Sequence, residues 1–315
     1  MSSSEGTDGF DVADIIEPRA RDLGDGFMVR RALPSIQRRS IGPFVFLDQM
    51  GPASFRSGGG LDVRPHPHIG LATVTYLFSG ELLHQDSLGS RQLIRPAEVN
   101  WMIAGRGIAH SERTPIPARS QASSLSGIQA WVGLPQHEEE SAPQFTHHEE
   151  RSLPQLEHAG VQLRLIAGTL SGLHSPVETR SAMFYADARL QPGATLTLDR
   201  EHVERAIYVY EGALEIERRP FTAGRLVVLR SGRPVPMLSR DGARLLLLGG
   251  APLDGARHVW WNFVSSSPER IQRAAEQWRS GGFARVPGDD EFIPLPDTPP
   301  PGAPGVEPPR PVSYP

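Results

Sequence analysis

The chain has 315 residues, a formal net charge of −4 and no cysteine, and every basic residue is arginine because no lysine occurs. The missing thiols and amines exclude disulfides, thiolate nucleophiles, cysteine metal sites and Schiff-base chemistry. The acidic balance argues against direct nucleic-acid binding. Any metal must therefore be held by His, Asp or Glu, and the 11 histidines leave this route open.

Residues 1–24 are expected to form a flexible N-terminus. The first ten residues have neither a basic region nor an apolar stretch, so no signal peptide is predicted. No run of about 18 apolar residues occurs, so neither a transmembrane helix nor membrane contact is expected. We expect a cytoplasmic protein.

Short strands separated by turns are predicted along most of the chain. Gly and Pro number 32 and 30, and such frequent punctuation favours strands and turns over long helices. The pattern predicts an all-β sandwich or barrel. The expected strands, rich in β-branched and aromatic residues, include Thr73–Phe78, Val99–Ile103, Ile128–Val132, Met183–Ala186, Ala206–Tyr210 and Arg225–Leu229.

A short internal similarity suggests that the β domain is duplicated. Residues 75–82 read TYLFSGEL and residues 207–214 read IYVYEGAL. Each segment is interpreted as an aromatic strand, a turn at Gly80 or Gly212, and a new strand.

Two pairs of metal-ligating residue types lie in the first half. His66 with His68, and His110 with Glu112, are spaced i, i+2, which places both side chains of a pair on one face of a strand. If the two strands are neighbours, four donors converge. Three imidazoles and a carboxylate suit a divalent ion such as Fe, Mn, Cu, Ni or Zn, and four protein ligands leave octahedral positions open for a substrate or O2. The alternative, ordinary surface or core histidines, is less favoured.

Other residues have plainer interpretations. His84 with Asp86 either orients a ligand or caps a hairpin turn, and the cap is favoured. Arg106 either steers an anionic substrate or is an ordinary surface arginine. The large side chains that either line a pocket or pack in the core are Phe46, Trp101, Met102 and Trp131.

The segment 136–154 is polar and is predicted to be a linker. Its histidines are expected to be solvated rather than ligands, because no rigid strand is predicted to hold them. They are His137, His147 and His148.

In the second half, His202 and Glu204 share a strand face by spacing, but no second His-containing turn follows. A metal-free domain is therefore expected. A helix is predicted over 268–280, with Ser267 as N-cap, Pro268 at its first position and Trp260–Trp261 packed beneath it. The Pro-rich tail, residues 291–315, is predicted to be disordered.

Three segments closely resemble the pirin family of bicupins: RPHPHIGLATVTY (64–76), HQDSLG (84–89) and NWMIAGRGIAHSE (100–112). The resemblance covers residues 25–285. It implies two cupin (jelly-roll β-barrel) domains with a short C-terminal helix. These are an N-terminal metal-binding cupin over 25–135 and a C-terminal metal-free cupin over 155–290, which includes the helix.

Carried over by position, the ligands that the resemblance implies are His66, His68, His110 and Glu112. The resemblance implies Fe(II) as the preferred ion, with Mn, Co, Ni, Cu or Zn as alternatives. The general cupin pattern places a glutamate where this chain has Ala72. In pirins the carboxylate ligand instead follows the third histidine by two residues, and Glu112 holds that place.

The resemblance implies a flavonol (quercetin) 2,3-dioxygenase that acts on a small aromatic, flavonol-like substrate and O2, with Glu112 as catalytic base. The alternative is a metal- or redox-dependent regulatory protein that binds a protein partner as a transcriptional or metabolic co-regulator. A third interpretation is a structural bicupin with an adventitious metal. The dioxygenase is favoured.

Overall fold

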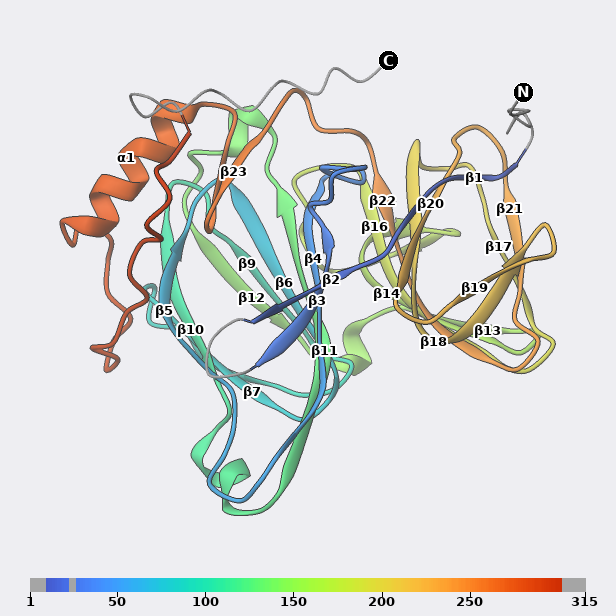
Figure 1. Ribbon diagram of the computed structural model, residues 1–315, viewed down its shortest axis with the longest axis horizontal. Helices are drawn as coiled ribbons and strands as arrows, with labels where there is room; N and C mark the ends of the chain where they lie inside the picture. The colour runs from blue at the N-terminus through green and yellow to red at the C-terminus, as the bar shows by residue number, and fades with distance from the viewer. Residues whose placement is uncertain (1–9, 23–26, 302–315) are drawn as a thin grey trace, which may run out of the picture. The chain divides into compact units, whose positions relative to one another are not determined.

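The computed structural model describes residues 10–22 and 27–301, which divide into two compact units built of β-strands (Figure 1). The prediction of an all-β protein with one short C-terminal α-helix is confirmed within these ranges. No helix there is long and apolar enough to span a membrane.

The first unit, here called the histidine unit, comprises Ala20–Arg31, Phe44–Ser152 and the chain from Leu253 onward. Its larger sheet has seven strands in the order β12 (Gln144–His148), β9 (Val99–Ile103), β6 (Leu71–Ser79), β11 (Ser123–Gly133), β4 (Phe44–Phe55), β3 (Met28–Leu33) and β2 (Arg19–Asp22). Its smaller sheet has four strands in the order β5 (Asp62–His68), β10 (Ile108–Arg113), β7 (Leu82–Asp86) and β8 (Arg91–Ile94).

The two sheets of the histidine unit share apolar clusters. One cluster joins Leu77 of β6 and Leu125 of β11 to Leu82 of β7 and Ile94 of β8, and all four are buried. The alternation of inward and outward side chains along each strand supplies these residues. Buried polar residues on β5, β7 and β10 are the exceptions that form the candidate site.

The prediction that residues 136–154 form a linker is wrong in part. Gln144–His148 forms β12, which pairs antiparallel with β9 and extends the seven-stranded sheet. Phe145 packs against the cluster that contains Met102 and Trp131, and this apolar contact anchors the strand. Short 3-10 turns at Gln136–Glu138 and Glu150–Ser152 flank it.

The helix α1 (Pro268–Arg279) lies within the range predicted for it, but it belongs to the histidine unit and not to the second cupin. The Ser267 hydroxyl accepts a hydrogen bond from the Arg270 backbone N–H, as an N-cap does. Buried Ile271 and Ala274 pack with Ile69 and with Phe263 of β24 (Phe263–Ser265), the partner of β23 (His258–Trp260). Trp260 and Trp261 pack on the same cluster, as expected.

The start of the Pro-rich tail is ordered, which corrects the prediction of disorder for residues 291–301. The Ile293 N–H donates to the carbonyl of Pro65 in β5, and the Trp278 indole N–H donates to the carbonyl of Ile293. The Trp260 indole donates to the Thr298 carbonyl. An extended chain leaves its carbonyls free to accept such bonds, and the rest of the tail, 302–315, lies outside the described residues.

The second unit comprises the chain up to Arg19, Ala32–Pro43 and Leu153–Pro252. The main path of its sheet runs β1 (Val12–Ile16), β20 (Arg225–Leu229), β18 (Glu204–Ile216), β22 (Ala243–Gly250), β16 (Met183–Leu190), β14 (Val161–Leu170) and β13 (Gln155–His158). Off this path lie β15 (Leu173–His174), β17 (Thr195–Leu198), β19 (Arg219–Thr222) and β21 (Val235–Leu238).

The prediction of a flexible N-terminus over 1–24 is wrong for the strand β1, which pairs with β20. Val12 and Ile16 are both buried, and Val12 packs into the core of the second unit. Burial of this apolar surface offsets the entropy lost in ordering the strand. Residues 1–9 and 23–26 lie outside the described ranges.

Residues 75–82 and 207–214 share the backbone conformation of their glycines, but only the first segment has the predicted turn. Gly80 and Gly212 both have positive φ, +81° and +73°. Gly80 separates β6 from β7, whereas Gly212 lies inside the continuous strand β18, next to a register shift in the pairing with β22. The second half therefore bends one strand where the first half starts a new one.

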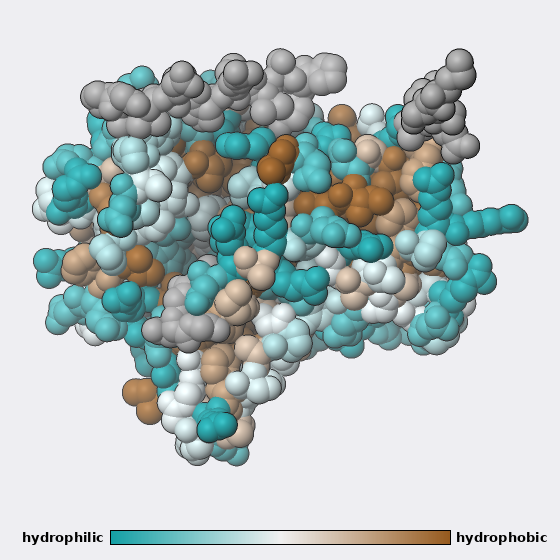
Figure 2. All heavy atoms as spheres, viewed as in Figure 1, coloured by the Kyte–Doolittle hydropathy of each residue, from teal (hydrophilic) through white to brown (hydrophobic). Residues whose placement is uncertain are grey.

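Hydrophilic side chains cover most of the face drawn in Figure 2, and apolar ones form separate patches between them. Exposed apolar side chains include Ile36, Ile116 and Phe292.

Candidate metal centre

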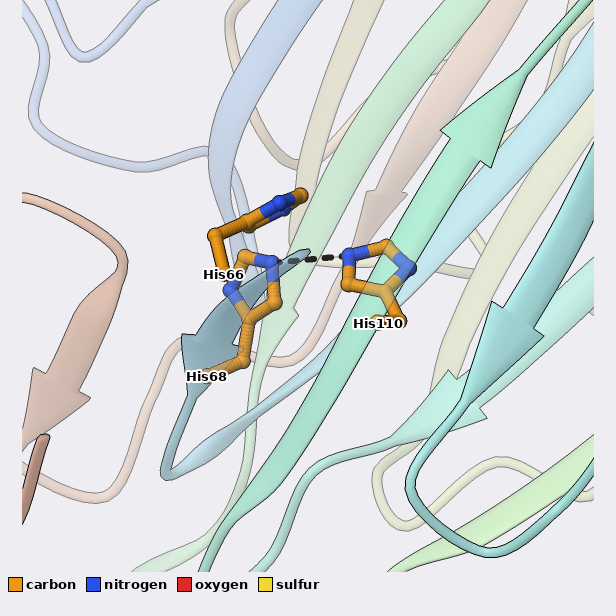
Figure 3. A group of neighbouring side chains, drawn as sticks. All are labelled: His66, His68 and His110. Carbon is orange, nitrogen blue, oxygen red and sulfur yellow. Dashed lines mark hydrogen bonds between the residues drawn. The ribbon is translucent and has the colours of Figure 1, made fainter. Parts of the chain in front are cut away.

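His66, His68 and His110 come from two neighbouring antiparallel strands. In the pairing of β10 with β5, His110 lies opposite His66 and Ile108 lies opposite His68. The three rings point toward one another, with ring centroids 4.4 to 5.0 Å apart (Figure 3). Their nitrogens lie within 4.8 Å of one another, and all three side chains are buried. The structure thus brings together the three histidines that the spacing selected.

Backbone carbonyls fix which ring nitrogen of two histidines faces the centre. His66 Nδ1 is 2.9 Å from the Arg64 carbonyl, and His68 Nδ1 is 3.1 Å from the Asn262 carbonyl. A carbonyl only accepts, so each Nδ1 carries the proton and each Nε2 keeps a lone pair. His68 Nε2 lies 3.1 Å from His110 Nε2. Such inward lone pairs fit a cation between them.

Burial keeps these rings neutral. Desolvation lowers the pKa of His66 to about 4, although its hydrogen bond to the Arg64 carbonyl raises it. Desolvation, together with the neighbouring imidazoles, holds the pKa values of His68 and His110 well below 6.5. Neutral imidazole is the form that binds metal, so the three rings are ready to coordinate an ion at neutral pH.

Glu112 lies at the edge of the three-histidine group. Its carboxylate falls within 4.8 Å of nitrogens of His84 and His110, so the predicted four-ligand set divides into two overlapping groups that share His110. The register of β10 shifts against β5 between His110 and Glu112. Glu112 Oε1 accepts a hydrogen bond from Thr75 Oγ1 at 2.7 Å. Burial raises the pKa of Glu112, which opposes the lowering effect of this bond.

Asp86 caps a turn, and His84 links Asp86 to the centre. Asp86 Oδ1 accepts from the backbone N–H groups of Leu88 and Ser90, while Asp86 Oδ2 lies 3.0 Å from His84 Nε2. His84 Nδ1 lies 3.4 Å from His110 Nδ1. The predicted cap is present, and the ligand contact that the sequence left as the lesser alternative is present beside it.

Three residues that contact the site were not selected as candidates from the sequence. Thr75 bonds Glu112, Asn262 bonds His68, and Phe145 stacks on the His84 ring with centroids 4.2 Å apart. None of the three had a signal in the sequence. The positions of β6 from Leu71 to Leu77 are all buried, so burial does not distinguish Thr75, and Asn262 and Phe145 reach the site from other parts of the chain.

The aromatic candidates pack around the centre. The Trp131 ring meets the His68 ring edge-on at 5.1 Å and stacks on Phe46 at 3.9 Å. Phe46, Met102 and Trp131 belong to one buried cluster, so core packing explains them. Trp101 is also buried, whereas the Arg106 side chain is exposed.

A cavity of about 390 Å³ lies behind the two ligand strands. Pro65 and Ala109 line it, and in a strand these residues face opposite to His66 and His110. Its other walls are the end of α1 and the segment after it, including Trp278, Phe283 and Phe292. This cavity is therefore separate from the candidate metal centre.

Among the described residues, the remaining histidine candidates form no metal-ligating group. His147 Nδ1 lies 2.8 Å from Asn100 Oδ1 on the paired strand. In the second unit, His202 Nε2 bonds the Thr169 carbonyl, and Glu204 accepts from the Gly42 N–H. Leu165, Ile207 and Leu247 belong to the apolar core of that unit.

Comparison with known proteins supports the assignment of both halves. Residues 26–132 match the family model Pirin, and residues 185–284 match the Pirin C-terminal cupin domain. A pirin-like protein of Caulobacter vibrioides is 46% identical over 288 residues, 90% of this chain and 99% of that protein. A pirin-like protein of Solanum lycopersicum is 31% identical over 278 residues, 85% of this chain and 91% of that protein.

Among solved structures, a quercetin 2,3-dioxygenase from Acinetobacter baumannii is similar to this chain with a TM-score of 0.84 and 34% identity. The similarity covers 91% of this chain and 95% of that one. The expectation of two cupin-type domains is thereby confirmed.

Proposed function

Because the chain belongs to the pirin family, we propose that it is a metal-dependent flavonol 2,3-dioxygenase. In this proposal His66, His68, His110 and Glu112 hold one divalent ion, with Fe(II) first and Mn, Co, Ni, Cu or Zn as alternatives. The observation that carries the proposal is the convergence of three buried, neutral imidazoles whose free nitrogens face one point. The similarity to the Acinetobacter baumannii quercetin 2,3-dioxygenase supports the choice of reaction.

A bound divalent ion would act as a Lewis acid on the 3-hydroxyl of the flavonol and would supply a site for O2. The residues of the chain then have separate tasks. Glu112, a buried carboxylate beside His84 and His110, accepts the proton of the 3-hydroxyl. Thr75 holds Glu112 Oε1 in place. The net reaction converts one flavonol and one O2 to the ring-opened product and one carbon monoxide.

Buried aromatic side chains shield one side of the histidines from water. Trp131 packs edge-on against His68, Phe46 stacks on Trp131, and both aromatic side chains are buried. Exclusion of water strengthens the electrostatic effect of a carboxylate on a nearby hydroxyl.

The test is anaerobic loading of the purified chain with each of Fe, Mn, Co, Ni, Cu and Zn, followed by addition of quercetin and air. The expected result is loss of the quercetin absorption band, with uptake of one O2 and release of one carbon monoxide per flavonol. A protein that binds an ion but shows no turnover with any of the six contradicts the dioxygenase.

The regulatory alternative uses the same centre as a switch for a protein partner. It stays a prediction, and it requires partner binding that depends on the oxidation state of the metal. A His66→Ala variant that kept full partner binding would contradict it.

A further inference from the structure

The orientation of His110 depends on a contact that the ligand set does not include. The two other histidines are oriented by backbone carbonyls of Arg64 and Asn262. For His110 the corresponding contact is to a side chain, because its Nδ1 faces His84 Nδ1 at 3.4 Å. If His110 presents Nε2 to a metal, its Nδ1 carries the proton and needs an acceptor. His84 Nδ1 is the acceptor in place.

Asp86 determines that His84 accepts rather than donates. Its Oδ2 lies 3.0 Å from His84 Nε2 and can only accept, so the ring proton of His84 belongs on Nε2. His84 Nδ1 is then left with a lone pair that faces His110. The chain of donors therefore runs in one direction, from His110 Nδ1–H to His84 and from His84 Nε2–H to Asp86.

The surroundings hold both residues still. Asp86 is fully buried, and its second oxygen, Oδ1, accepts from the Leu88 and Ser90 N–H groups at 2.9 and 3.0 Å. The His84 ring lies flat against Phe145, with an angle of 10° between the rings. In the register of β10 with β7, Asp86 lies directly opposite His110, and His84 lies opposite Glu112.

We propose that Asp86 and His84 are positioning residues for the metal centre, and that Asp86, through the tautomer of His84, directs Nε2 of His110 toward the ion. The inference rests on the proposed metal centre but not on the dioxygenase reaction. It assigns the turn after β7 a role in metal affinity in addition to its role as a cap.

Asp86→Asn is the decisive variant, because the turn itself fixes how the new amide is oriented. The amide oxygen of the substituted side chain must take the place of Oδ1 to accept from Leu88 and Ser90, so its NH2 group faces His84 Nε2. His84 then has to accept at Nε2 and carry its proton on Nδ1. Two N–H groups face each other between His84 and His110, and His110 loses its acceptor.

The readouts are the Kd for Co(II), measured by competition with a chelator, and the visible absorption of the Co(II) complex. Neither requires turnover. For Asp86→Asn we expect the Kd to rise about 10- to 100-fold, the range found when the partner of a metal-bound histidine is removed, and the Co(II) bands to shift. A matched control is Asp199→Asn, which changes a turn-capping carboxylate in the second unit and should leave both readouts unchanged.

A second pair of variants keeps the test decisive if Asp86→Asn unfolds. His84→Gln retains a carbonyl acceptor for His110 Nδ1–H, whereas His84→Leu has none. We expect His84→Gln to keep most of the Co(II) affinity and His84→Leu to lose as much as Asp86→Asn.

Three results would overturn the inference. The first is a Kd within twofold of wild type, with unchanged bands, in Asp86→Asn or in His84→Leu. The second is complete loss of binding in His84→Leu with retention in His66→Ala, which would make His84 a ligand of the overlapping group. The third is absence of metal binding by the wild type, which would remove the centre itself. Tight binding without quercetin turnover rejects only the dioxygenase.

Discussion

Gly70, two residues after His68, is expected to tolerate no side chain. Its φ is +67°, and a Cβ placed on it would lie 2.0 Å from the carbonyl oxygen of Val264 in β24. Since such contacts under 3.0 Å essentially do not occur, the backbone would have to move by about 1 Å. That movement would disturb the hydrogen bond from the Val264 N–H to the Ile69 carbonyl.

Gly89 provides the matched comparison for Gly70→Ala. Its φ is +89°, and a Cβ there would meet nothing within 4 Å. Gly89→Ala should therefore cost only the left-handed backbone penalty, about 1 to 2 kcal/mol. Gly70→Ala adds a weakened hydrogen bond, about 1 kcal/mol, and looser packing around the buried Ile69 and Phe263, about 2 kcal/mol more.

Tryptophan fluorescence during urea unfolding reports this difference specifically for the histidine unit. All 5 tryptophans of the chain, Trp101, Trp131, Trp260, Trp261 and Trp278, belong to the histidine unit. We expect Gly70→Ala to lose about 3 kcal/mol more unfolding free energy than Gly89→Ala. Equal losses in the two variants would refute the steric argument, because they would show that the Val264 carbonyl does not restrict this position.

Three further predictions concern the histidines and Glu112. His66→Ala should lower the metal content of the purified protein more than tenfold. His202→Ala removes a histidine of the second unit and should leave the metal content unchanged. Equal metal content in the two variants would contradict the ligand assignment. The metal-free protein should lose stability as the pH falls from 7 to 5, because the unfolded chain protonates His66 near 6.5 and the folded chain only near 4. This histidine alone accounts for about 2 kcal/mol of that loss, and urea unfolding of His66→Gln at both pH values should show a correspondingly smaller loss. Thr75→Val removes the hydroxyl that donates to Glu112 and should weaken metal binding about tenfold. Thr75→Ser retains a hydroxyl and should bind the metal as the wild type does. Equal affinities in the two variants would show that the hydroxyl is not needed.

The two pairs of candidate ligands could be selected from the sequence because strand geometry is local. A spacing of i, i+2 places His66 with His68, and His110 with Glu112, on one face whatever the rest of the chain does. The absence of lysine and cysteine narrowed the chemistry further, since only histidine and carboxylate could serve. The helix was equally local, with Ser267 and Pro268 marking its start.

The domain boundaries could not be predicted in this way, because they depend on contacts between distant segments. The strand β1 pairs with β20, which lies far along the chain, and the helix packs on Ile69 of the histidine unit rather than in the second cupin. Neither the spacing nor the composition of a segment shows which apolar surface will cover it.

The sequence by itself therefore determined the class of fold and the placement of His66 with His68, and of His110 with Glu112, on one strand face each. Only the tertiary structure decided that β5 and β10 are neighbours, and how the three imidazoles are oriented. The acceptor of each Nδ1 proton comes from a different place: Arg64 on the same strand, Asn262 before β24, and His84 on β7 with Asp86 behind it. A hydrogen bond needs its partner at about 3 Å with the right geometry, and only the folded chain sets these distances.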